Sequence, residues 1–473
     1  MKIDLKLINR TVCLLFAFII LFTMITLKAQ RYGDGNEYFL MLESFRNHFS
    51  PDLQMEDIKK SYVGERNAFG EKADPYWGYF KGRDQRWYSQ HFWAYSLTSL
   101  PAKAILELFG FKGSRSLQIT NALLFAFTLL VLNFFSKLDE KQKLLSTLLL
   151  TFSPALWFIH WTHPEIFILC WVTLSLIFFH SNKYPLAIIS AVLASFQNQV
   201  LTLYVLFLLI KAAFNSHFKI KTLILYGALS ALVFLPNAFY WMVFGRFNPL
   251  SDATALANIS AFRVFEAFFD LNIGLLPYLP LSLLFFFGVI LFRLISQSGF
   301  SDDWQIFILI IALITVCSAT DNWNHGTSGP SRYVIWILPF IFYTLITNLK
   351  TIWKGPVLKT LFVSAVAWQV FIVVSGGLLV HEEDYLKHTS LAQFVLNRFP
   401  ELYNPSYEIF CERTQHSESA CEDPTIYTHK NQCKKALVTC DGLNKLESLC
   451  GKVDKNFQEA CKNHQEKWFY VDY

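Results

Sequence analysis

The sequence predicts an all-α membrane protein that crosses the bilayer about 11 times, and three observations carry that prediction. Of 473 residues, 53% are hydrophobic and only 16% are charged, a balance far from that of soluble domains. Apolar runs of roughly 17 to 25 residues, the length that spans a hydrocarbon core, recur from Thr11 to Val380. Most of the nine cysteines lie together in a polar C-terminal tail. The net charge of +5 sits in short connections between apolar runs, and we expect no nucleic-acid partner.

The first apolar run, residues 11–27, follows Lys2, Lys6 and Arg10, and basic residues before a first span place the N-terminus in the cytoplasm. A signal segment is the alternative. The run is longer than a usual signal core and has no clear small-x-small cleavage pattern, which favours a retained helix. The other expected spans cover residues 116–135, 144–161, 165–180, 184–197, 199–210, 222–245, 277–297, 304–319, 333–349 and 360–380.

Basic residues in alternate connections orient these spans, because Lys and Arg favour the cytoplasmic side. The residues concerned are Lys137, Lys141, Lys143, Lys183, Lys211, Lys219, Lys221, Arg293, Lys350, Lys354 and Lys359. With these inside, residues 162–165, residues 321–332 and the C-terminal tail lie outside. The chain therefore divides into a transmembrane domain at 1–380, whose first external loop is 29–89, and an external cysteine-rich domain at 381–473.

Two further segments are expected to touch the membrane without crossing it. Residues 91–111 hold Pro101 and Lys103 within an apolar stretch, which favours a re-entrant or interfacial segment, although Lys103 could also snorkel. A full crossing there would invert the parity of the spans and put the cysteine-rich tail inside. Residues 248–269 are interpreted as an external amphipathic helix along the membrane surface.

The polar tail is expected to be a small α-rich external cap held by disulfides. Its cysteines are Cys411, Cys421, Cys433, Cys440, Cys450 and Cys461. Six cysteines allow fifteen pairings, so the connectivity stays open. Zinc is the competing interpretation, but the tail has no CxxC pair, and the spacings fit a stapled secreted-type domain better.

Ionisable and polar side chains gather at the external membrane boundary. They are Asp34, Glu37, His91, His163, Glu165, Asp321, Asn324, His325 and Arg332. A charged loop beside a membrane explains each one alone, but their collection on one side indicates a site. His163 and Glu165 interrupt an apolar hairpin that has almost no loop. They predict a functional pair, or a helix cap with Thr162 or His163 near the N-cap and Pro164 at N1.

Four stretches carry a resemblance to a known family. They are GDGNEYFLMLESF after the first span, GRDQRWYSQHFWAYSLTSLPAK, SPALWFIHWTHPEIFILCW and WNHGTSGPSRYVIWILPF. In these stretches the chain resembles the GT-C superfamily of polyprenyl-phosphate-sugar-dependent glycosyltransferases, in particular bacterial relatives of protein mannosyltransferases and aminoarabinose transferases. Members of that family begin the first external loop with adjacent acidic residues, whereas here Gly35 and Asn36 separate Asp34 from Glu37.

The resemblance implies a GT-C-like bundle in a bacterial inner membrane, with a polyprenyl-phosphate-linked sugar as donor substrate. Asp34 would act as the catalytic base, with Glu37 as the second carboxylate, and Arg332 would bind the lipid phosphate. Further substrate-binding residues would be Tyr38, His91, His163, Glu165, His325 and Tyr333, with Lys81, Arg83 and Arg86 as weaker candidates. A divalent metal held by Asp34, Glu37, His163 and Glu165 stays open, because no spacing signature supports it.

The expected function is an inverting glycosyltransferase with an external active site, whose acceptor is a lipid or lipid-linked glycan and less readily a protein. A transporter or flippase of a lipid-linked sugar is the first alternative, but the apolar runs between Leu201 and Ile310 are nearly uncharged. A non-catalytic membrane scaffold with the same fold is the second alternative. The displaced position of Glu37 favours that second reading.

Overall fold

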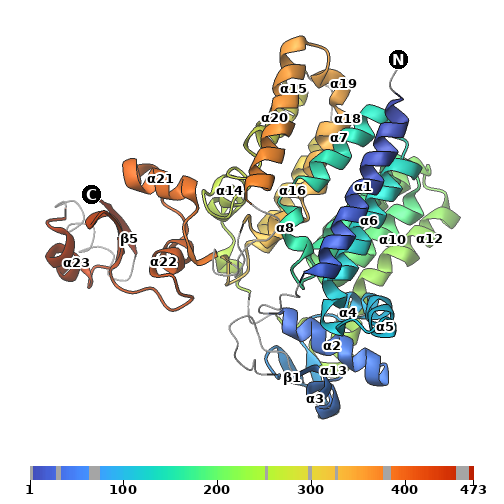
Figure 1. The fold of residues 1–473 in the computed structure, drawn as a ribbon, viewed down its shortest axis with the longest axis horizontal. Coiled ribbons are helices and arrows are strands. Elements are labelled where there is room, and N and C mark those ends of the chain that lie inside the picture. Colours follow the sequence, from blue (N-terminus) through green and yellow to red (C-terminus); the bar gives the residue numbers. More distant parts are fainter. Residues whose placement is uncertain are drawn as a thin grey trace.

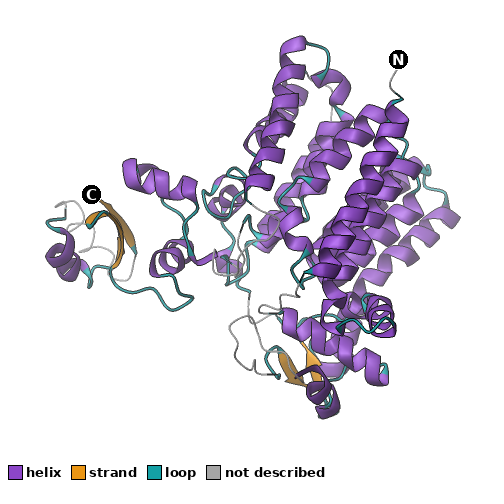
Figure 2. Ribbon diagram, in the orientation of Figure 1, coloured by secondary structure: helices purple, strands orange, loops and turns teal. Residues whose placement is uncertain are grey.

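The computed structural model describes residues 4–27, 34–62, 75–250, 254–296, 301–324, 329–376, 385–453 and 468–473. Most of these residues are helical. A bundle of long helices carries a small cap at one end, and a C-terminal domain lies to one side of the bundle (Figure 1). Two small sheets, one in the cap and one in the C-terminal domain, correct the all-α prediction (Figure 2).

The bundle contains helices in each of the predicted apolar runs. They are α1 (Leu5–Thr26), α6 (Ser116–Phe135), α7 (Glu140–Thr151), α8 (Ala155–Ile159), α9 (Glu165–His180), α10 (Tyr184–Gln197), α11 (Thr202–Asn215), α12 (Ile220–Ala231), α13 (Leu235–Phe244), α15 (Pro280–Ile295), α16 (Asp302–Cys317), α17 (Arg332–Ile335), α18 (Leu338–Thr347), α19 (Leu349–Ile352) and α20 (Pro356–Ser375). The run at 144–161 is not one helix, because Pro154, which cannot donate a backbone hydrogen bond, separates α7 from α8.

Four helical stretches among the described residues are long and apolar enough to cross a bilayer. They are Leu5–Thr26, Gly113–Phe135, Ile220–Phe244 and Pro356–Ser375. Five shorter apolar helices accompany them. The protein therefore carries membrane-type helices, and the finer count of about eleven spans stays a prediction.

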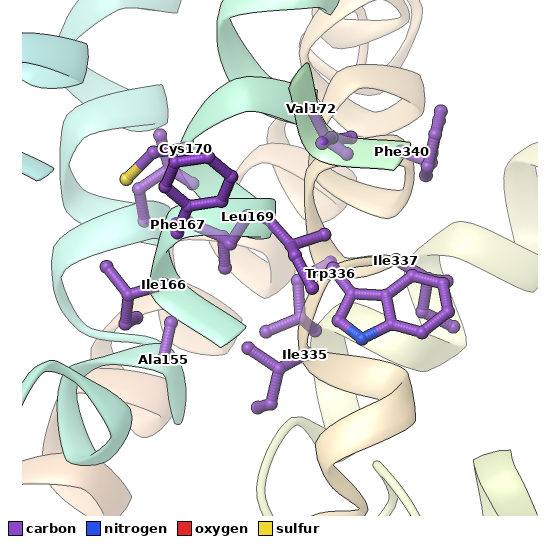
Figure 3. Packing of buried hydrophobic residues seen from close by; sticks show 14 of the residues in the cluster. Ala155, Ile166, Phe167, Leu169, Cys170, Val172, Ile335, Trp336, Ile337 and Phe340 are labelled. Atoms are coloured by element: carbon purple, nitrogen blue, oxygen red, sulfur yellow. The ribbon is translucent and has the colours of Figure 1, made fainter. Parts of the chain in front are cut away.

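Helix α9 lies at the centre of the bundle and is buried on every side. Figure 3 shows Val172 of this helix on the side of Phe340 and Phe167 on the other side, beside Cys170, and all of these side chains are buried. A helix that is hydrophobic all round is typical of a protein core or a membrane span, and here other helices surround it. Its neighbours here include α6, α10, α17 and α18. This packing fixes the first residue of α9 beside the start of α17.

The bundle has two opposite ends, and side-chain hydrogen bonds join the helix termini at one of them. At one end, Asn9 Nδ2 donates to the carbonyl oxygen of Glu140 over 2.6 Å, and Arg293 Nη2 donates to Asn348 Oδ1 over 2.7 Å. The connections that carry the basic residues lie at this end. Asp34 lies beyond the other end of α1, where the cap begins.

The cap consists of α2 (Gly35–His48), α3 (Met55–Tyr62), β1 (Tyr79–Lys81), β2 (Trp87–Ser89), α4 (Ala94–Thr98) and α5 (Leu100–Leu108). The interfacial segment at 91–111 thus forms two helices too short to cross a hydrocarbon core of about 30 Å. Lys103 does not snorkel. Its ammonium is buried and pairs with Glu43 at 2.6 Å and Glu107 at 3.0 Å, because a buried charge needs a countercharge.

The surface helix expected at 248–269 is shorter than predicted. Within that range α14 covers Ala261–Phe269. Phe262 and Phe265 are exposed on one side, whereas Glu266 and Phe268 are buried on the other. The helix is therefore amphipathic, as expected, over only nine residues.

The C-terminal domain is not simply α-rich. Its elements are α21 (Ser390–Arg398), α22 (Tyr407–Gln415), β3 (Thr425–His429), β4 (Gln432–Val438), α23 (Leu443–Cys450) and β5 (Phe469–Asp472). Strand β4 lies between β3 and β5 in an antiparallel sheet. Its residues 436–438 are fully buried, as is typical of a central strand with a continuous apolar run.

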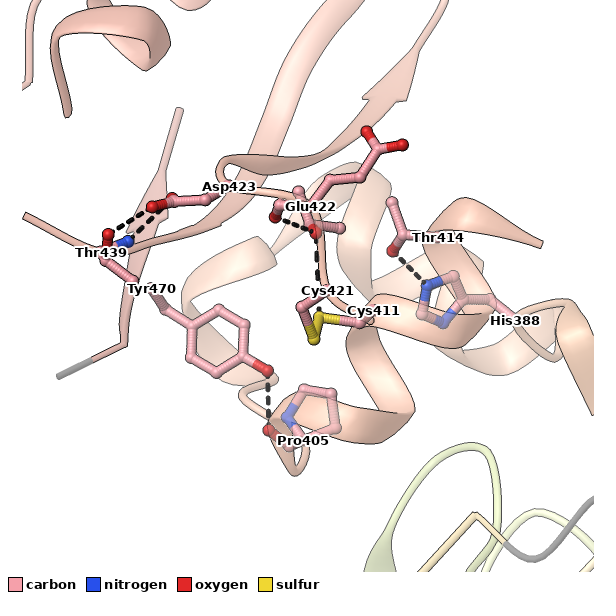
Figure 4. Close-up of a disulfide and its surroundings, with 10 residues drawn as sticks. His388, Pro405, Cys411, Thr414, Cys421, Glu422, Asp423, Thr439 and Tyr470 are labelled. Carbon is pink, nitrogen blue, oxygen red and sulfur yellow. Dashed lines mark hydrogen bonds between the residues drawn. A yellow bond between two sulfur atoms is a disulfide. The ribbon is translucent and has the colours of Figure 1, made fainter. Parts of the chain in front are cut away.

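Disulfides hold this domain together, as predicted from its cysteines. Cys411 pairs with Cys421, as Figure 4 shows, and Cys433 pairs with Cys450. Cys440 is disulfide-bonded as well. Cys461 lies outside the described residues.

Candidate functional site

A cavity of about 420 Å³ lies where the cap meets the bundle. Eight of the residues predicted to gather at the site line it: Asp34, Tyr38, His91, His163, Glu165, Asp321, Arg332 and Tyr333. They come from five separate stretches of the chain that the fold brings together. Ionisable groups buried beside apolar helices usually pair with one another or serve a function.

Asp34 directly precedes α2, and the position of that helix depends on Gly35. A Cβ atom at Gly35 would lie 2.3 Å from Thr162 Oγ1, so no larger residue fits there without a shift of the 162–164 loop. The close approach brings the start of α2 against the loop that carries His163. The glycine inserted between Asp34 and Asn36 thus has a packing reason.

The Asp34 carboxylate pairs with two cations. Arg332 Nη1 donates to Asp34 Oδ2 over 3.2 Å, and His91 Nε2 lies 3.8 Å from the same oxygen. Burial opposes ionisation of Asp34, but the charges of His91 and Arg332 outweigh it and hold the pKa of Asp34 well below its usual range. Asp34 is therefore a carboxylate across the physiological pH range.

Glu37 is buried behind His91 and is not among the residues that line the cavity, so its role as a second catalytic carboxylate stays a prediction. Its side chain accepts hydrogen bonds from Ser89 Oγ and from the backbone N–H of His91. Its Oε2 lies 3.0 Å from His91 Nδ1. Burial lowers the pKa of His91, but the carboxylates of Glu37 and Asp34 raise it to about 9.

Arg332 carries hydrogen-bonding capacity that the described residues do not use. Its Nη1 donates to Asp34, whereas its Nε is buried and has no hydrogen-bond partner among the described residues. The guanidinium carbon lies 5.4 Å from the centre of the Tyr333 ring. A buried unpaired donor is costly unless a ligand completes it, and a guanidinium binds phosphate oxygens with two parallel hydrogen bonds.

His163 and Glu165 are both buried at the wall of the cavity. The His163 ring stacks on Trp161, with ring centres 3.6 Å apart. His163 Nδ1 lies 4.0 Å from Glu165 Oε2. The predicted helix cap is wrong, because the N-cap residue of α9 is Pro164 and Glu165 occupies N1. There the Glu165 carboxylate faces the positive end of the helix dipole.

Three of these groups could hold a metal ion. One ligand atom each from Asp34, Glu37 and His91 lies within 4.8 Å of the others. Carboxylate and imidazole donors of this kind suit Mn²⁺ or Zn²⁺. His163 and Glu165 do not belong to that group.

Other predicted residues lie elsewhere. His325 falls outside the described residues. Asn324 faces the C-terminal domain, where its side chain bonds to Glu412 and Arg413. The weaker candidates Lys81, Arg83 and Arg86 do not line the cavity.

Sequence reasoning missed a set of neutral polar residues in the same cavity. They are Gln90, Gln197, Asn198, Gln199 and Asn248. No charge or spacing marked them, although the run QNQ at 197–199 interrupts two apolar helices. That interruption was the signal that could have found them.

Comparison of the chain with protein-family models, with curated proteins and with solved structures finds no match.

Proposed function

We propose that the protein is an inverting glycosyltransferase that moves a sugar from a polyprenyl-phosphate carrier to a lipid or glycan acceptor on the non-cytoplasmic side of the membrane. The observation that carries the proposal is the Asp34–Arg332 pair inside a cavity at one end of a membrane-type helix bundle. Asp34 can accept a proton, and Arg332 can bind a phosphate. The resemblance of the surrounding motifs to GT-C enzymes agrees with this reading.

In the proposed reaction, an acceptor hydroxyl attacks the anomeric carbon while the bond from that carbon to the phosphate oxygen breaks. The bonding electrons leave with the phosphate, and Asp34 takes the hydroxyl proton. Attack from the face opposite the phosphate inverts the anomeric centre. A weak base suffices, because the hydroxyl becomes acidic only as it bonds to an oxocarbenium-like carbon.

Arg332 stabilises the leaving group in this scheme. Negative charge grows on the phosphate as the bond breaks, so a fixed guanidinium stabilises the transition state more than the ground state. Its buried Nε is a donor that a phosphate oxygen can fill. A phosphate on Arg332 also weakens the hold of Arg332 on Asp34, which raises the basicity of Asp34 when the donor is bound.

The test is transfer of radiolabel from a panel of polyprenyl-phosphate sugars by the purified protein in lipid nanodiscs with added membrane lipid. Asp34→Asn should lower transfer by about 10² to 10⁴, the usual contribution of a general base. Arg332→Ala should lower it by about 10² or more, because a charge-stabilising donor is lost.

Matched controls come from the same external loop. Asp84 and Arg86 are a carboxylate and a guanidinium with exposed side chains, 48% and 61% accessible, so Asp84→Asn and Arg86→Ala should keep wild-type transfer. Full transfer by Asp34→Asn would overturn the proposed base. Donor binding without transfer from any donor would favour the scaffold or the transporter, both of which can bind a lipid-linked sugar. No donor binding at all would overturn the proposed function.

A further inference from the structure

The neutral end of the cavity is lined by side-chain amides. Gln197, Asn198 and Gln199 lie in a row where α10 ends and the short 3-10 helix η2 (Gln199–Leu201) begins. Gln90 and Asn248 reach the same cavity from the first loop and from the segment after α13. Carboxamides carry both donors and acceptors and no charge. With Asn322, six carboxamides line the cavity, a composition typical of a ligand-binding site rather than of helix packing.

Hydrogen bonds fix several of these amides in place. Gln197 Nε2 donates to the carbonyl oxygen of Phe92 over 2.7 Å, and Asn198 Oδ1 accepts the backbone N–H of Val200 over 3.1 Å. Asn237 Nδ2 donates to Gln199 Oε1 over 3.0 Å. The amide wall is therefore built before a ligand arrives, and its groups do not need to be ordered on binding.

One of the amides is incompletely bonded. Gln197 Oε1 is buried and has no hydrogen-bond partner among the described residues, although its Nε2 is fixed. A buried acceptor without a donor is unfavourable, and a ligand hydroxyl would complete it. Aromatic rings of Phe92, Phe196 and Tyr240 line the same part of the cavity. Amides beside aromatic faces match a sugar, whose hydroxyls bond while its C–H face packs on a ring.

We infer that the amide wall formed by Gln90, Gln197, Asn198, Gln199 and Asn248 holds the sugar of the donor, and that it selects an uncharged sugar. This inference rests on the proposed function and names its substrate class. A carboxylate on the sugar would meet neutral amides at this wall instead of a countercharge. His91 and Arg332, cations that line the cavity, already pair with Asp34. A site built to bond hydroxyls discriminates strongly against a ligand that leaves its polar groups unpaired.

Binding of soluble short-chain carriers tests the inference without relying on catalysis. The probes are farnesyl phosphate, farnesyl-phosphate glucose and farnesyl-phosphate glucuronic acid, titrated into the purified full-length protein in neutral-lipid nanodiscs. The wild type should bind the glucose carrier about 10-fold or more tighter than the bare phosphate or the glucuronic acid carrier, as expected for two or more net hydrogen bonds.

Methionine replaces glutamine with similar shape and no polar atoms, so Gln197→Met and the double variant Q90M/Q197M remove the bonds with little change in volume. Both should reduce the advantage of the glucose carrier, to about threefold or less in the double variant, while the affinity for farnesyl phosphate stays unchanged. Unchanged phosphate affinity also shows that the variant is folded. Gln54→Met, at an exposed position outside the cavity, is the matched control and should behave as wild type.

Equal affinity of the wild type for all three carriers would overturn the inference, as would a glucose advantage that survives in Q90M/Q197M. Preferred binding of the glucuronic acid carrier would overturn the assignment to an uncharged sugar. These results differ from failure of the proposed function, in which the wild type would bind none of the carriers.

Discussion

At the scale of single residues, the cavity depends on a short series of alternating charges. Glu37 is fully buried and holds His91 from behind, His91 faces Asp34, and Arg332 approaches Asp34 from the other side. Two carboxylates and two cations balance one another in a place where an unpaired charge would be costly. Glu37 is thus a positioning residue that acts through the charge and orientation of the His91 ring.

Replacing Glu37 by Gln should lower the pH at which the affinity for the carrier phosphate begins to fall. The carboxylate that most raises the pKa of His91 is lost, so His91 becomes neutral well below the wild-type value of about 9. Affinity for farnesyl-phosphate glucose, a phosphodiester whose charge does not change over this range, should stay constant from pH 6 to 8 in the wild type and should fall by about 10-fold in Glu37→Gln. Titrations at several pH values measure it.

The control for this prediction is the double variant with His91→Asn. If Glu37 acts through His91, the double variant and His91→Asn alone should have the same weak and pH-independent affinity. An additional loss in the double variant would show that Glu37 contributes by another route.

The charged part of the site could be predicted from sequence, and the neutral part could not. Asp34, His163, Glu165 and Arg332 stand out because ionisable residues next to apolar runs are rare and costly. A neutral amide such as Gln197 is not costly at a helix end. Its presence in the sequence therefore does not indicate a binding site, and only the fold shows that these amides line one cavity. The burial of Glu37 behind His91 depends on three-dimensional packing, which the spacing of these residues in the sequence does not predict.

At the scale of elements, α22 joins the C-terminal domain to the segment before Arg332. Glu408 accepts the backbone N–H groups of Trp323 and Asn324 at 3.0 and 2.9 Å, and Arg413 Nη2 donates to Asn324 Oδ1 over 3.2 Å. Glu412 accepts from the Asn324 side chain. Apolar runs predicted the bundle helices well, whereas neither this contact nor the β3-β4-β5 sheet follows from a short polar tail, where periodicity is weak.

The contact between α22 and the segment of Trp323 and Asn324 should weaken as pH rises. Burial, and then the neighbouring charge of Glu408, raise the pKa of Glu412 to about 7. Because that pKa is raised above the unfolded value near 4.5, the folded state binds the proton more tightly, and the stabilisation present at low pH is lost as pH rises through about 7. Hydrogen exchange at the backbone amides of Trp323 and Asn324, corrected for intrinsic rates, should therefore be less protected at pH 8 than at pH 6.

Glu412→Gln keeps a neutral acceptor at that position and should make the protection of these amides nearly equal at the two pH values. Glu401→Gln, at an exposed position of the same domain, should leave the wild-type difference in place. The same pH difference in Glu412→Gln as in the wild type would assign the effect to another group.

At the scale of the whole molecule, the bundle has two chemically different ends. Contacts such as Asn9 with Glu140 gather the basic connections at one end, and the cap with its polar cavity forms the other. Sequence predicted this polarity because the distribution of Lys and Arg is a direct signal of membrane sidedness. It could not fix the number of crossings, since short helices such as α8 have bounds that depend on tertiary packing.

The polarity predicts which end faces the cytoplasm, and the helical stretch Ile220–Phe244 offers both ends for one experiment. Lys219 and Arg246 flank it and are exposed. In right-side-out membrane vesicles, a membrane-impermeant maleimide should label Arg246→Cys directly and Lys219→Cys only after permeabilisation. The native cysteines of the transmembrane region, Cys13, Cys170 and Cys317, are buried and should give little background. Labelling of Lys219→Cys alone in sealed vesicles would invert the orientation and place the cavity in the cytoplasm, where the proposed donor geometry would not apply.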